Sequence, residues 1–429
     1  MTASRSASPW WIPLDQRHVW HPYTHHFGGD APPPIARAEG AYLYDTEGRA
    51  ILDAISSWWV TLHGHAHPTI ADAVARQAAT LEQVIFAGFT HEPAARLAAE
   101  LVKVLPPGLS RVFFSDDGST AVEVALKMAL QYWRNRGEKR TTIVALENAY
   151  HGDTFGAMSV SASGVFTEPF TEHLFQVERL PDPSRADVVL PFARLLAERH
   201  TEIAAIIVEP LLMGAGGMHV WNASALAALR GLAAEFGVLF IADEVLTGFG
   251  RTGPLFACEH AGITPDLICL SKGLTGGFLP LGATAAREEV FAEFARGPDR
   301  RLMLFHGHSF TANPIACAAA RASLSLLDAR SAERRRAIER AHRAGMERLK
   351  EHPRVRDPRV LGTVAAFDLD VAGGYLSPIG PELARFALED GVLLRPLGSV
   401  VYVLPPYAIE PDEVASVYDV IARFLASRC

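Results

Sequence analysis

Two polar residues of complementary chemistry follow short apolar runs in the middle of the chain. Asp243 comes directly after Val238–Ala242, and Lys272 lies two residues beyond Leu267–Leu270. Such runs are typical of buried parallel strands, and open α/β sheets bind ligands at the carboxyl ends of their strands. A lysine amine can condense with an aldehyde, and a carboxylate can keep a pyridine nitrogen protonated. The pair therefore suits pyridoxal phosphate as a cofactor attached to Lys272.

A second motif offers a place for a phosphate group on the same sheet edge. The sequence FFSDDGSTAVEVALKMA passes from an expected strand through Gly118 and Ser119 into an expected helix. The apolar stripe of this helix consists of Val122, Leu126, Ala129 and Trp133. Free N–H groups and the positive dipole end make a helix start a phosphate site. Taken singly, the motif also fits an ordinary serine N-cap. In the same way, Lys272 alone could be a solvated lysine, and Asp243 alone could be a helix N-cap.

Two further residues suit the faces of a planar cofactor ring. Tyr150 follows the expected strand TTIVALE at the same edge, and Val245 lies two residues beyond Asp243. We expect Tyr150 to stack on one face of the ring and Val245 to cover the other. A buried core tyrosine is the alternative for Tyr150.

The bulk composition excludes several classes of protein. The chain has 429 residues, 49% hydrophobic and 21% charged, which is ordinary for a globular protein of two domains. Its formal charge is −8, from 40 basic and 48 acidic residues, so neither nucleic acid nor an anionic membrane is expected as a partner. No apolar run reaches the roughly 18 residues of a membrane span, and the N-terminus lacks a secretory signal. We therefore expect a cytoplasmic protein.

Neither the cysteines nor the histidines are spaced as metal ligands. The cysteines are widely separated and contain no CxxC pair: Cys258, Cys269, Cys317 and Cys429. Three histidines stand at alternate positions: His63, His65 and His67. Because no matched carboxylate or cysteine accompanies them, we expect no metal site.

The order of the expected elements indicates an α/β fold with a second, smaller unit. Between about residues 70 and 320, short apolar runs alternate with helical patterns, which predicts right-handed crossovers and a mostly parallel sheet. A charge-rich helical stretch follows from Ala316 to about Leu349, and its Arg334–Arg336 run is expected on a solvated face. Strand-like segments and a final amphipathic helix then suggest α+β structure. We divide the chain into an N-terminal segment, 1–65, joining a small domain at 322–429, and a large domain at 66–321.

Taken together, the motifs resemble those of the class III, or ω-type, aminotransferases, which depend on pyridoxal phosphate. The matching pieces are GSTAVEVALK, YHGDT, VEP, IADEVLTGFGRTG, SKGL and HGHSFTANPIACAAA. The resemblance implies fold type I, with a mostly parallel sheet of the seven-stranded type, a small α+β domain from both chain ends, and a homodimer with shared active sites. It assigns the cofactor to Lys272, Asp243, Gly118, Ser119 and Tyr150.

The same resemblance assigns a loop of the other subunit to each active site. This loop contributes Gly307 to the substrate site and His308 and Ser309 to the cofactor phosphate. The branch of the family that this chain resembles most has Pro-Thr where this chain has His308-Ser309. Serine keeps the hydroxyl group, so phosphate binding should survive the change.

Two segments, DQRHVWHPYT and SSWWVTLHGHAHP, are similar to the biotin-biosynthesis branch of the family. That branch transfers an amino group from S-adenosyl-L-methionine to 8-amino-7-oxononanoate by a ping-pong reaction, in which the freed lysine moves the proton as base and acid. The resemblance implies that Trp58, Trp59 and Tyr23 form the wall around the aliphatic substrate. Tyr23 would contact both substrates and take part in catalysis.

A carboxylate-binding arginine is implied near the C-terminus. Arg395, in VLLRPLGSVVYVLPPY, would bind the substrate carboxylate, with Tyr402 nearby in the same motif. Without this context, paired tryptophans are more often core residues, and Arg395 could form a surface ion pair.

Other functions remain open from the sequence. Another ω-aminotransferase would act on ornithine, 4-aminobutyrate or a β-amino acid, and Glu209 resembles the glutamate that such enzymes pair with a C-terminal arginine. Lysine could replace adenosylmethionine as the donor. An aminomutase and a non-catalytic binding protein of the same fold are the more distant alternatives.

Overall fold

A seven-stranded sheet forms the centre of the larger part of the molecule. The computed structural model describes residues 9–26 and 32–428. The strand order is β4-β12-β11-β10-β7-β5-β6. The bounds are β4 Leu109–Ser115, β5 Thr142–Leu146, β6 Glu178–Leu180, β7 Ile203–Val208, β10 Leu239–Asp243, β11 Leu267–Leu270 and β12 Gly282–Arg287. Only β12 among these runs antiparallel to its neighbours, so the prediction of a mostly parallel sheet is confirmed.

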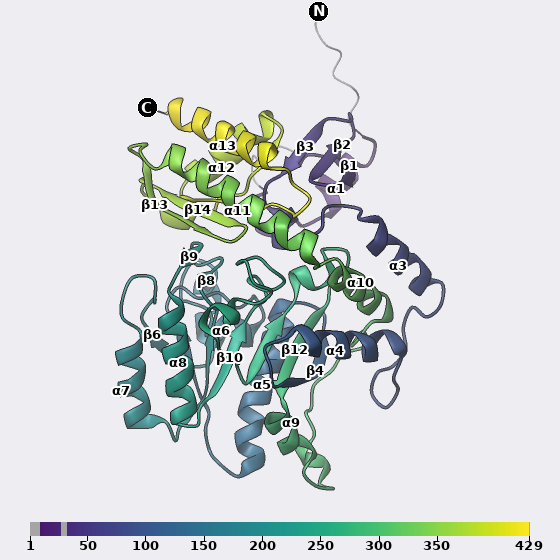
Figure 1. Ribbon diagram of the computed structural model, residues 1–429, viewed down its shortest axis with the longest axis vertical. Coiled ribbons are helices and arrows are strands. Elements are labelled where there is room, and N and C mark those ends of the chain that lie inside the picture. Colours follow the sequence, from purple (N-terminus) through teal and green to yellow (C-terminus); the bar gives the residue numbers. More distant parts are fainter. Residues whose placement is uncertain (1–8, 27–31, 429) are drawn as a thin grey trace, which may run out of the picture.

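The central strands are buried on both faces, which explains their continuous apolar runs. Every residue of β7, β10 and β11 is buried. Helices cover the two faces of the sheet (Figure 1). They include α3 Pro68–Ala78, α4 Glu92–Val104, α5 Gly118–Arg136, α6 Phe155–Val160, α7 Val189–Arg199, α8 Ala223–Glu235, α9 Glu288–Ala295 and α10 Pro314–Ser325. The expected apolar stripe of α5 is buried at all four positions.

Both ends of the described chain contribute to the smaller part, drawn at the top of Figure 1. Its first sheet has the order β1-β2-β3-β15, in which β15 comes from the C-terminal region, and its second has the order β13-β14-β16. The strands are β1 Ile35–Glu39, β2 Tyr42–Asp45, β3 Ala50–Asp53, β13 Val355–Leu361, β14 Val364–Leu369, β15 Val392–Leu393 and β16 Val400–Val403. The helices packed here are α11 Ala329–Leu349, α12 Ile379–Glu389 and α13 Pro411–Ala426. The α+β character is confirmed, and the domain boundaries at 65 and 321 stay predictions.

The remaining elements are short. They are α1 Ile12–His18, α2 Ser56–Trp59, the hairpin strands β8 Leu212–Met213 and β9 His219–Val220, and the 3-10 helices η1 Glu168–His173, η2 Ala257–Ala261, η3 Lys272–Thr275, η4 Arg300–Leu302 and η5 Gly374–Leu376.

The structure corrects the long helix expected from Ala316. Two helices, α10 and α11, occupy this stretch, and Asp328 caps the second by accepting a hydrogen bond from the Ser331 N–H. The prediction that Arg334–Arg336 lie on a solvated helix face is also wrong for the middle residue. Arg335 is buried, and its guanidinium donates to the Gly253 carbonyl at 2.9 Å. A helical pattern does not show which polar residues meet a neighbouring carbonyl.

Several absences apply to residues 9–26 and 32–428. No helix there is long and apolar enough to cross a membrane. No group of three or more His, Cys, Asp or Glu side chains there could hold a metal ion. Three cysteines there are free and buried: Cys258, Cys269 and Cys317.

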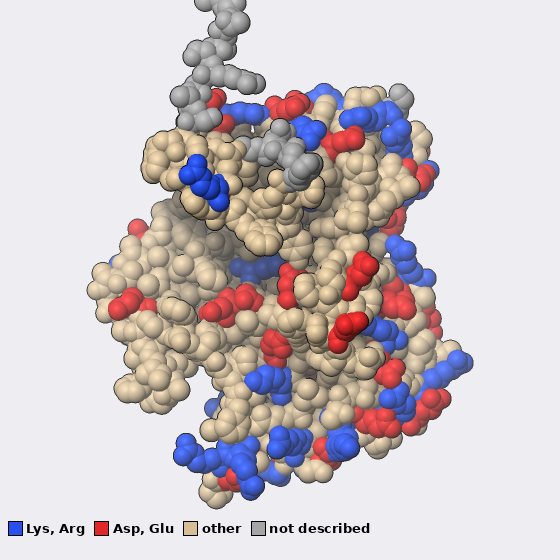
Figure 2. All heavy atoms as spheres, turned by 180° about the vertical axis from the view of Figure 1, so that it is seen from behind, with Lys and Arg blue, Asp and Glu red and all other residues tan. Residues whose placement is uncertain are grey.

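On the face shown in Figure 2, a hollow between the upper and lower parts has Lys or Arg side chains at its floor.

Candidate active site

A cavity of about 690 Å³ lies at the carboxyl ends of β10 and β11. Both Asp243 and Lys272 line it. Asp243 is the last residue of β10, which pairs in parallel with β11, and Lys272 begins the 3-10 helix just after β11. Parallel pairing therefore brings the carboxylate and the amine to one sheet edge, as the apolar runs predicted.

The amine of Lys272 lies in an apolar environment. Its Nζ stands 4.6 Å from the centre of the Trp59 ring. Within the described part of the chain it makes no hydrogen bond or ion pair. Burial lowers the pKa of Lys272 to about 8, although the negative charges of Asp243 and Glu209 act in the opposite direction. A lowered pKa makes the neutral, nucleophilic amine available near neutral pH.

The carboxylate of Asp243 is oriented by a buried histidine. His151 Nδ1 lies 2.7 Å from Asp243 Oδ2, and the Val245 N–H donates to Oδ1 at 3.1 Å. The His151 side chain is fully buried, and its Nε2 has no hydrogen-bond partner in the described residues. With Nδ1 as the donor, His151 fixes the orientation of the Asp243 carboxylate, which can then pair with a protonated ring nitrogen.

The helix start expected to bind phosphate opens onto the same cavity. Gly118 and Ser119 line it as the first residues of α5, whose N-cap is Asp117. A Cβ on Gly118 would come within 2.6 Å of Val245, so the close packing requires glycine. The Ser119 hydroxyl lies 2.8 Å from the Thr154 hydroxyl. Val245 also lines the cavity, two residues beyond Asp243.

Two tyrosines share one carboxylate at the edge of the cavity. Tyr150 donates to Asp153 Oδ1 at 2.9 Å, and Tyr23 donates to Asp153 Oδ2 at 2.6 Å. Burial, together with the charge of Asp153, raises the pKa of both phenols, so both stay protonated donors. Tyr150 and Asp153 line the cavity, whereas Tyr23 does not line it and is connected to it through Asp153.

The two tryptophans sit on a turn of unusual backbone conformation. Ser56, Ser57, Trp58 and Trp59 all have positive φ angles, between 45° and 76°. Left-handed backbone costs roughly 1–2 kcal/mol for each non-glycine residue, so the surroundings must maintain it. Buried Arg251 does so in part, because its guanidinium donates to the carbonyl groups of Trp59, Thr61 and Pro405.

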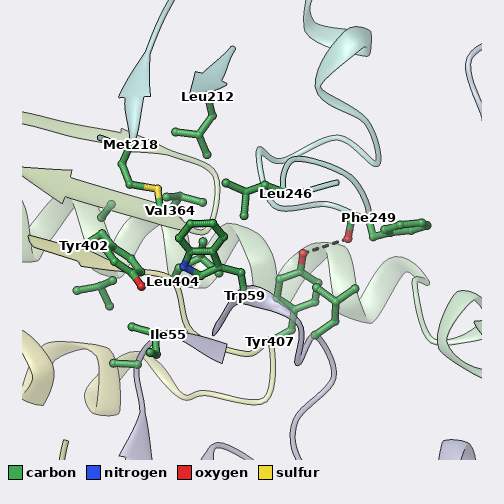
Figure 3. Close-up of a cluster of buried hydrophobic side chains, with 14 of the residues drawn as sticks. Ile55, Trp59, Leu212, Met218, Leu246, Phe249, Val364, Tyr402, Leu404 and Tyr407 are labelled. Atoms are coloured by element: carbon green, nitrogen blue, oxygen red, sulfur yellow. Dashed lines mark hydrogen bonds between the residues drawn. The ribbon is translucent and has the colours of Figure 1, made fainter. Parts of the chain in front are cut away.

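The turn sends the two indoles to different places. Trp59 is buried and lines the cavity, whereas Trp58 is 38% exposed. Figure 3 shows Trp59 between Leu212, Leu246 and Met218 on one side and Tyr402 and Leu404 on another. Tyr402 packs edge-on against Trp59, with ring centres 5.9 Å apart, and lies behind the indole rather than on the cavity wall.

Arg395 lies in a row of side chains that leads away from the cavity. Its guanidinium carbon stands 4.7 Å from the centre of the Trp58 ring. The Trp58 ring in turn meets Tyr23, with ring centres 5.6 Å apart, and Tyr23 bonds to Asp153. Within residues 9–26 and 32–428, Arg395 makes no ion pair. Because the guanidinium is stacked on Trp58 and has no acidic partner there, its charge is available to an anionic group of a ligand.

Gly307, His308 and Ser309 lie outside this cavity. They line a separate hollow of about 540 Å³ with Phe86 and Phe113. His308 reaches toward the site only through Asp116, with Nδ1 and Oδ2 3.5 Å apart. Within one chain, the structure does not bring Ser309 to the helix start of α5.

The buried Glu209 also lines the cavity. It accepts hydrogen bonds from the backbone N–H groups of Tyr150 and Gly214, both at 2.9 Å. Burial raises the pKa of Glu209 to about 7. No arginine pairs with it in the described residues, unlike the glutamate–arginine pair considered from the sequence.

The residues of the cavity fit pyridoxal phosphate. The unpartnered Lys272 amine can hold the aldehyde, and the Asp243 carboxylate can face the ring nitrogen. The start of α5 provides N–H groups for the phosphate, and Tyr150 and Val245 lie where the two ring faces would be. A fold of this kind, with these groups at one sheet edge, defines a pyridoxal-phosphate-dependent transferase of fold type I.

The chain belongs to the class III aminotransferases. The model of the family "Aminotransferase class-III" matches residues 27–425. Enzymes of this family use pyridoxal phosphate, so the cofactor prediction is confirmed.

Two curated relatives with the same enzyme name are similar to this chain over almost its whole length. The adenosylmethionine-8-amino-7-oxononanoate aminotransferase of Synechococcus elongatus is 53% identical, covering 95% of this chain and 98% of its own. The Mycobacterium leprae enzyme of that name is 40% identical, covering 94% of each chain.

Two solved structures have a fold similar to that of this chain. The enzyme of that name from Methanocaldococcus jannaschii has a TM-score of 0.93 at 34% identity, covering 97% of this chain and 98% of its own. An ω-transaminase from Pseudomonas jessenii, in complex with PMP, has a TM-score of 0.91 at 28% identity, covering 97% of each chain.

Sequence reasoning missed several residues of the site. His151 and Asp153 belong to the quoted motif YHGDT, and Arg251 belongs to GFGRTG, so the motifs contained the signal. Phe166 and Tyr375, which meet with ring centres 4.5 Å apart beside Tyr23 and Tyr150, lie in segments without a motif.

Proposed function

We propose that this protein transfers an amino group from S-adenosyl-L-methionine to 8-amino-7-oxononanoate, giving 7,8-diaminononanoate in biotin biosynthesis. The observation that carries the proposal is the row Asp153, Tyr23, Trp58 and Arg395 beside the cavity. A nine-carbon keto acid needs an apolar wall along its chain and a cation for its distant carboxylate. Trp58 supplies the wall and Arg395 the cation, and the relatives that carry this activity in their names support the assignment.

Pyridoxal phosphate, when bound, supplies an electron sink for the charge that develops at the substrate carbon. We assign its attachment to Lys272, its ring nitrogen to Asp243 and its phosphate to Gly118 and Ser119. Asp243, oriented by His151, would pair with the protonated ring nitrogen. Tyr150 and Val245 fix the plane of the ring between them.

Lys272 is the proposed base and acid of the reaction. Its Nζ, released when the donor amine binds, would take the proton from the donor α-carbon and deliver it to C4′ of the cofactor. With the keto acid, the same Nζ would carry the proton in the reverse direction. Because the pKa of Lys272 is lowered to about 8, a useful fraction of the amine is neutral at physiological pH. A positioned base of this kind contributes roughly 10²–10⁴-fold to the rate.

We assign substrate contacts to the residues around the mouth of the cavity. Tyr23, held by Asp153, would touch both substrates in turn, and Trp59 would close the inner wall next to Lys272. Tyr402, behind Trp59, would support the indole rather than touch the substrate.

We further propose a homodimer with shared active sites. Ser309, His308 and Gly307 lie outside the cavity of their own chain, so their assigned roles require a second subunit. Large exposed apolar side chains near this loop support the proposal: Ile85, Phe89, Met303, Phe305 and Phe310. In the proposed dimer, the Ser309 hydroxyl would bind the cofactor phosphate held by the partner subunit.

We propose a cytoplasmic location. Three buried thiols remain free, as expected in a reducing compartment.

The test is an assay of the purified holoenzyme with 8-amino-7-oxononanoate and either S-adenosyl-L-methionine or lysine, with 7,8-diaminononanoate measured by mass spectrometry. Formation of the diamine from adenosylmethionine supports the proposal. Turnover only with 4-aminobutyrate or ornithine and an α-keto acid would replace it by the general ω-aminotransferase. Glu209 argues against that alternative, because in the described residues it bonds to backbone N–H groups and pairs with no arginine.

A further inference from the structure

The turn that carries the two tryptophans starts beside the loop that carries Arg395. Asp53, the last residue of β3, pairs in parallel with Leu393, the last residue of β15. The Ala54 N–H donates to the Leu393 carbonyl at 3.3 Å, and Arg395 follows two residues beyond Leu393. Parallel strands end at the same edge of a sheet, so this pairing brings the start of the turn next to the start of the Arg395 loop.

Asp53 holds the start of the turn through its buried carboxylate. Its Oδ1 accepts from the Ile55 N–H at 3.1 Å, and its Oδ2 accepts from the Ser57 hydroxyl at 2.9 Å. His65 Nε2 lies 2.9 Å from the same Oδ2. The backbone of His65 exchanges hydrogen bonds with Gly40, at 2.7 and 3.2 Å. His65, one of the three alternate histidines of the sequence, therefore helps to orient the carboxylate toward Ser57.

The backbone conformation of Ser57 is unfavourable for serine. Its φ is 45° and its ψ is 48°, in the left-handed region that favours glycine. The hydrogen bond between its hydroxyl and Asp53 stabilises this conformation. An alanine at this position would keep the strain and lose the stabilising contact, whereas a glycine would lose both.

The two tryptophans depend on this hydrogen bond to different degrees. Trp59 has other supports, because the Arg251 guanidinium donates to its carbonyl at 3.3 Å and its indole is buried in the cluster of Figure 3. Trp58 directly follows Ser57, is 38% exposed, and stacks with the Arg395 guanidinium. Ser57 therefore controls the position of Trp58 more than that of Trp59.

We propose that Asp53 is a positioning residue for the keto acid, because through Ser57 it holds Trp58 against Arg395. The inference rests on the proposed function, in which Trp58 lines the acceptor chain and Arg395 binds its carboxylate. Asp53 does not line the cavity and touches neither substrate in this assignment. It favours a long acid with a terminal carboxylate by fixing the apolar wall next to the cation.

Ser57→Ala tests this role with little risk to folding, since it removes one hydroxyl and leaves Asp53 in place. The probe is nonanoate, which has the nine-carbon chain and the carboxylate of the keto acid but no reacting group. We expect calorimetry on the holoenzyme to show about tenfold weaker binding of nonanoate, as for the loss of one hydrogen bond to a charged group. For the keto acid, kcat/KM should fall by a similar factor, whereas the single-turnover reaction of adenosylmethionine should change less than about twofold.

Three further variants separate positioning from a general loss of structure. Ser57→Gly, which adopts the left-handed backbone without strain, should recover part of the lost affinity. In a Trp58→Ala background, removal of the Ser57 hydroxyl should change nonanoate binding less than about twofold, because the indole that it positions is absent. Ser110→Ala removes an exposed serine–carboxylate hydrogen bond of the same length, 2.9 Å to Glu288, and should have no effect.

The possible results are distinct. A Ser57→Ala enzyme that binds nonanoate like the wild type would overturn the role of Asp53. An equal slowing of the donor and acceptor reactions, or a tenfold loss that persists in the Trp58→Ala background, would overturn it as well. A wild type that forms no diamine with either donor instead contradicts the proposed function, and the nonanoate titration still decides the role of the turn because it requires no turnover.

Discussion

Burying Lys272 should cost the cofactor-free protein stability at neutral pH. Its pKa falls from 10.5 to about 8 on burial. At 1.36 kcal/mol per pKa unit, the shift corresponds to about 3 kcal/mol between the two states. Between pH 8 and 10.5 the unfolded chain binds this proton and the folded chain does not, so wild-type stability rises through that range. The penalty is complete below pH 8 and absent above 10.5.

Lys272→Met removes the ionisable group and keeps a side chain of similar length in the cavity. We therefore expect the cofactor-free variant to be more stable than the wild type by about 3 kcal/mol at pH 7. The advantage should shrink steadily between pH 8 and 10.5. Urea unfolding of both proteins at several pH values, at equal protein concentration, measures the difference.

A surface lysine provides the control. Lys103 is exposed near the end of α4, so Lys103→Met should change stability by less than about 0.5 kcal/mol at every pH. A Lys272→Met advantage that does not depend on pH would refute the reasoning, because a change in packing alone has no titration. A variant less stable than the wild type at pH 7 would refute it too.

Three further predictions concern the same cavity. The rate at which cofactor-free protein takes up pyridoxal phosphate, followed by absorbance, should rise with pH around a midpoint of about 8, because the neutral Lys272 amine reacts. A midpoint near 10.5, the value of an exposed lysine, would contradict the burial argument. His151→Leu should weaken cofactor binding by roughly 10–100-fold in equilibrium titration, since hydrogen bonds to charged groups are worth about 1.5–3 kcal/mol. His151→Asn, which keeps a donor near Asp243, should recover part of the loss, and equal loss in both variants would exclude the hydrogen bond as the cause. Arg395→Met should raise KM for the keto acid at least tenfold and leave the single-turnover reaction of the donor unchanged; an equal effect on both substrates would rule out a carboxylate-specific role for Arg395.

The sequence was sufficient for the strands and for the pair at their ends. Apolar runs such as Val238–Ala242 and Leu267–Leu270 mark strands that are buried on both faces, and their spacing along the chain places Asp243 and Lys272 at one edge. This inference needs only local pattern and the direction of parallel strands. The same holds for the helix that begins at Gly118.

Where the sequence misled us, a neighbour in space decided the outcome. Arg335 lies in a run of three arginines, yet it is buried because the Gly253 carbonyl accepts a hydrogen bond from its guanidinium. The antiparallel direction of β12 likewise follows from contacts between distant segments, whereas the break before α11 is local, because Asp328 caps that helix.

Some features of the site follow from the sequence alone, and others are determined only by the folded structure. The chain alone identifies the lysine, the carboxylate and the helix start, because residue type and local spacing define them. The left-handed turn that separates Trp58 from Trp59, the pairing of His151 with Asp243, and the contact between Phe166 and Tyr375 are properties of the folded molecule. Each joins segments far apart in sequence or maintains a backbone that is unfavourable by itself, so only tertiary packing determines it.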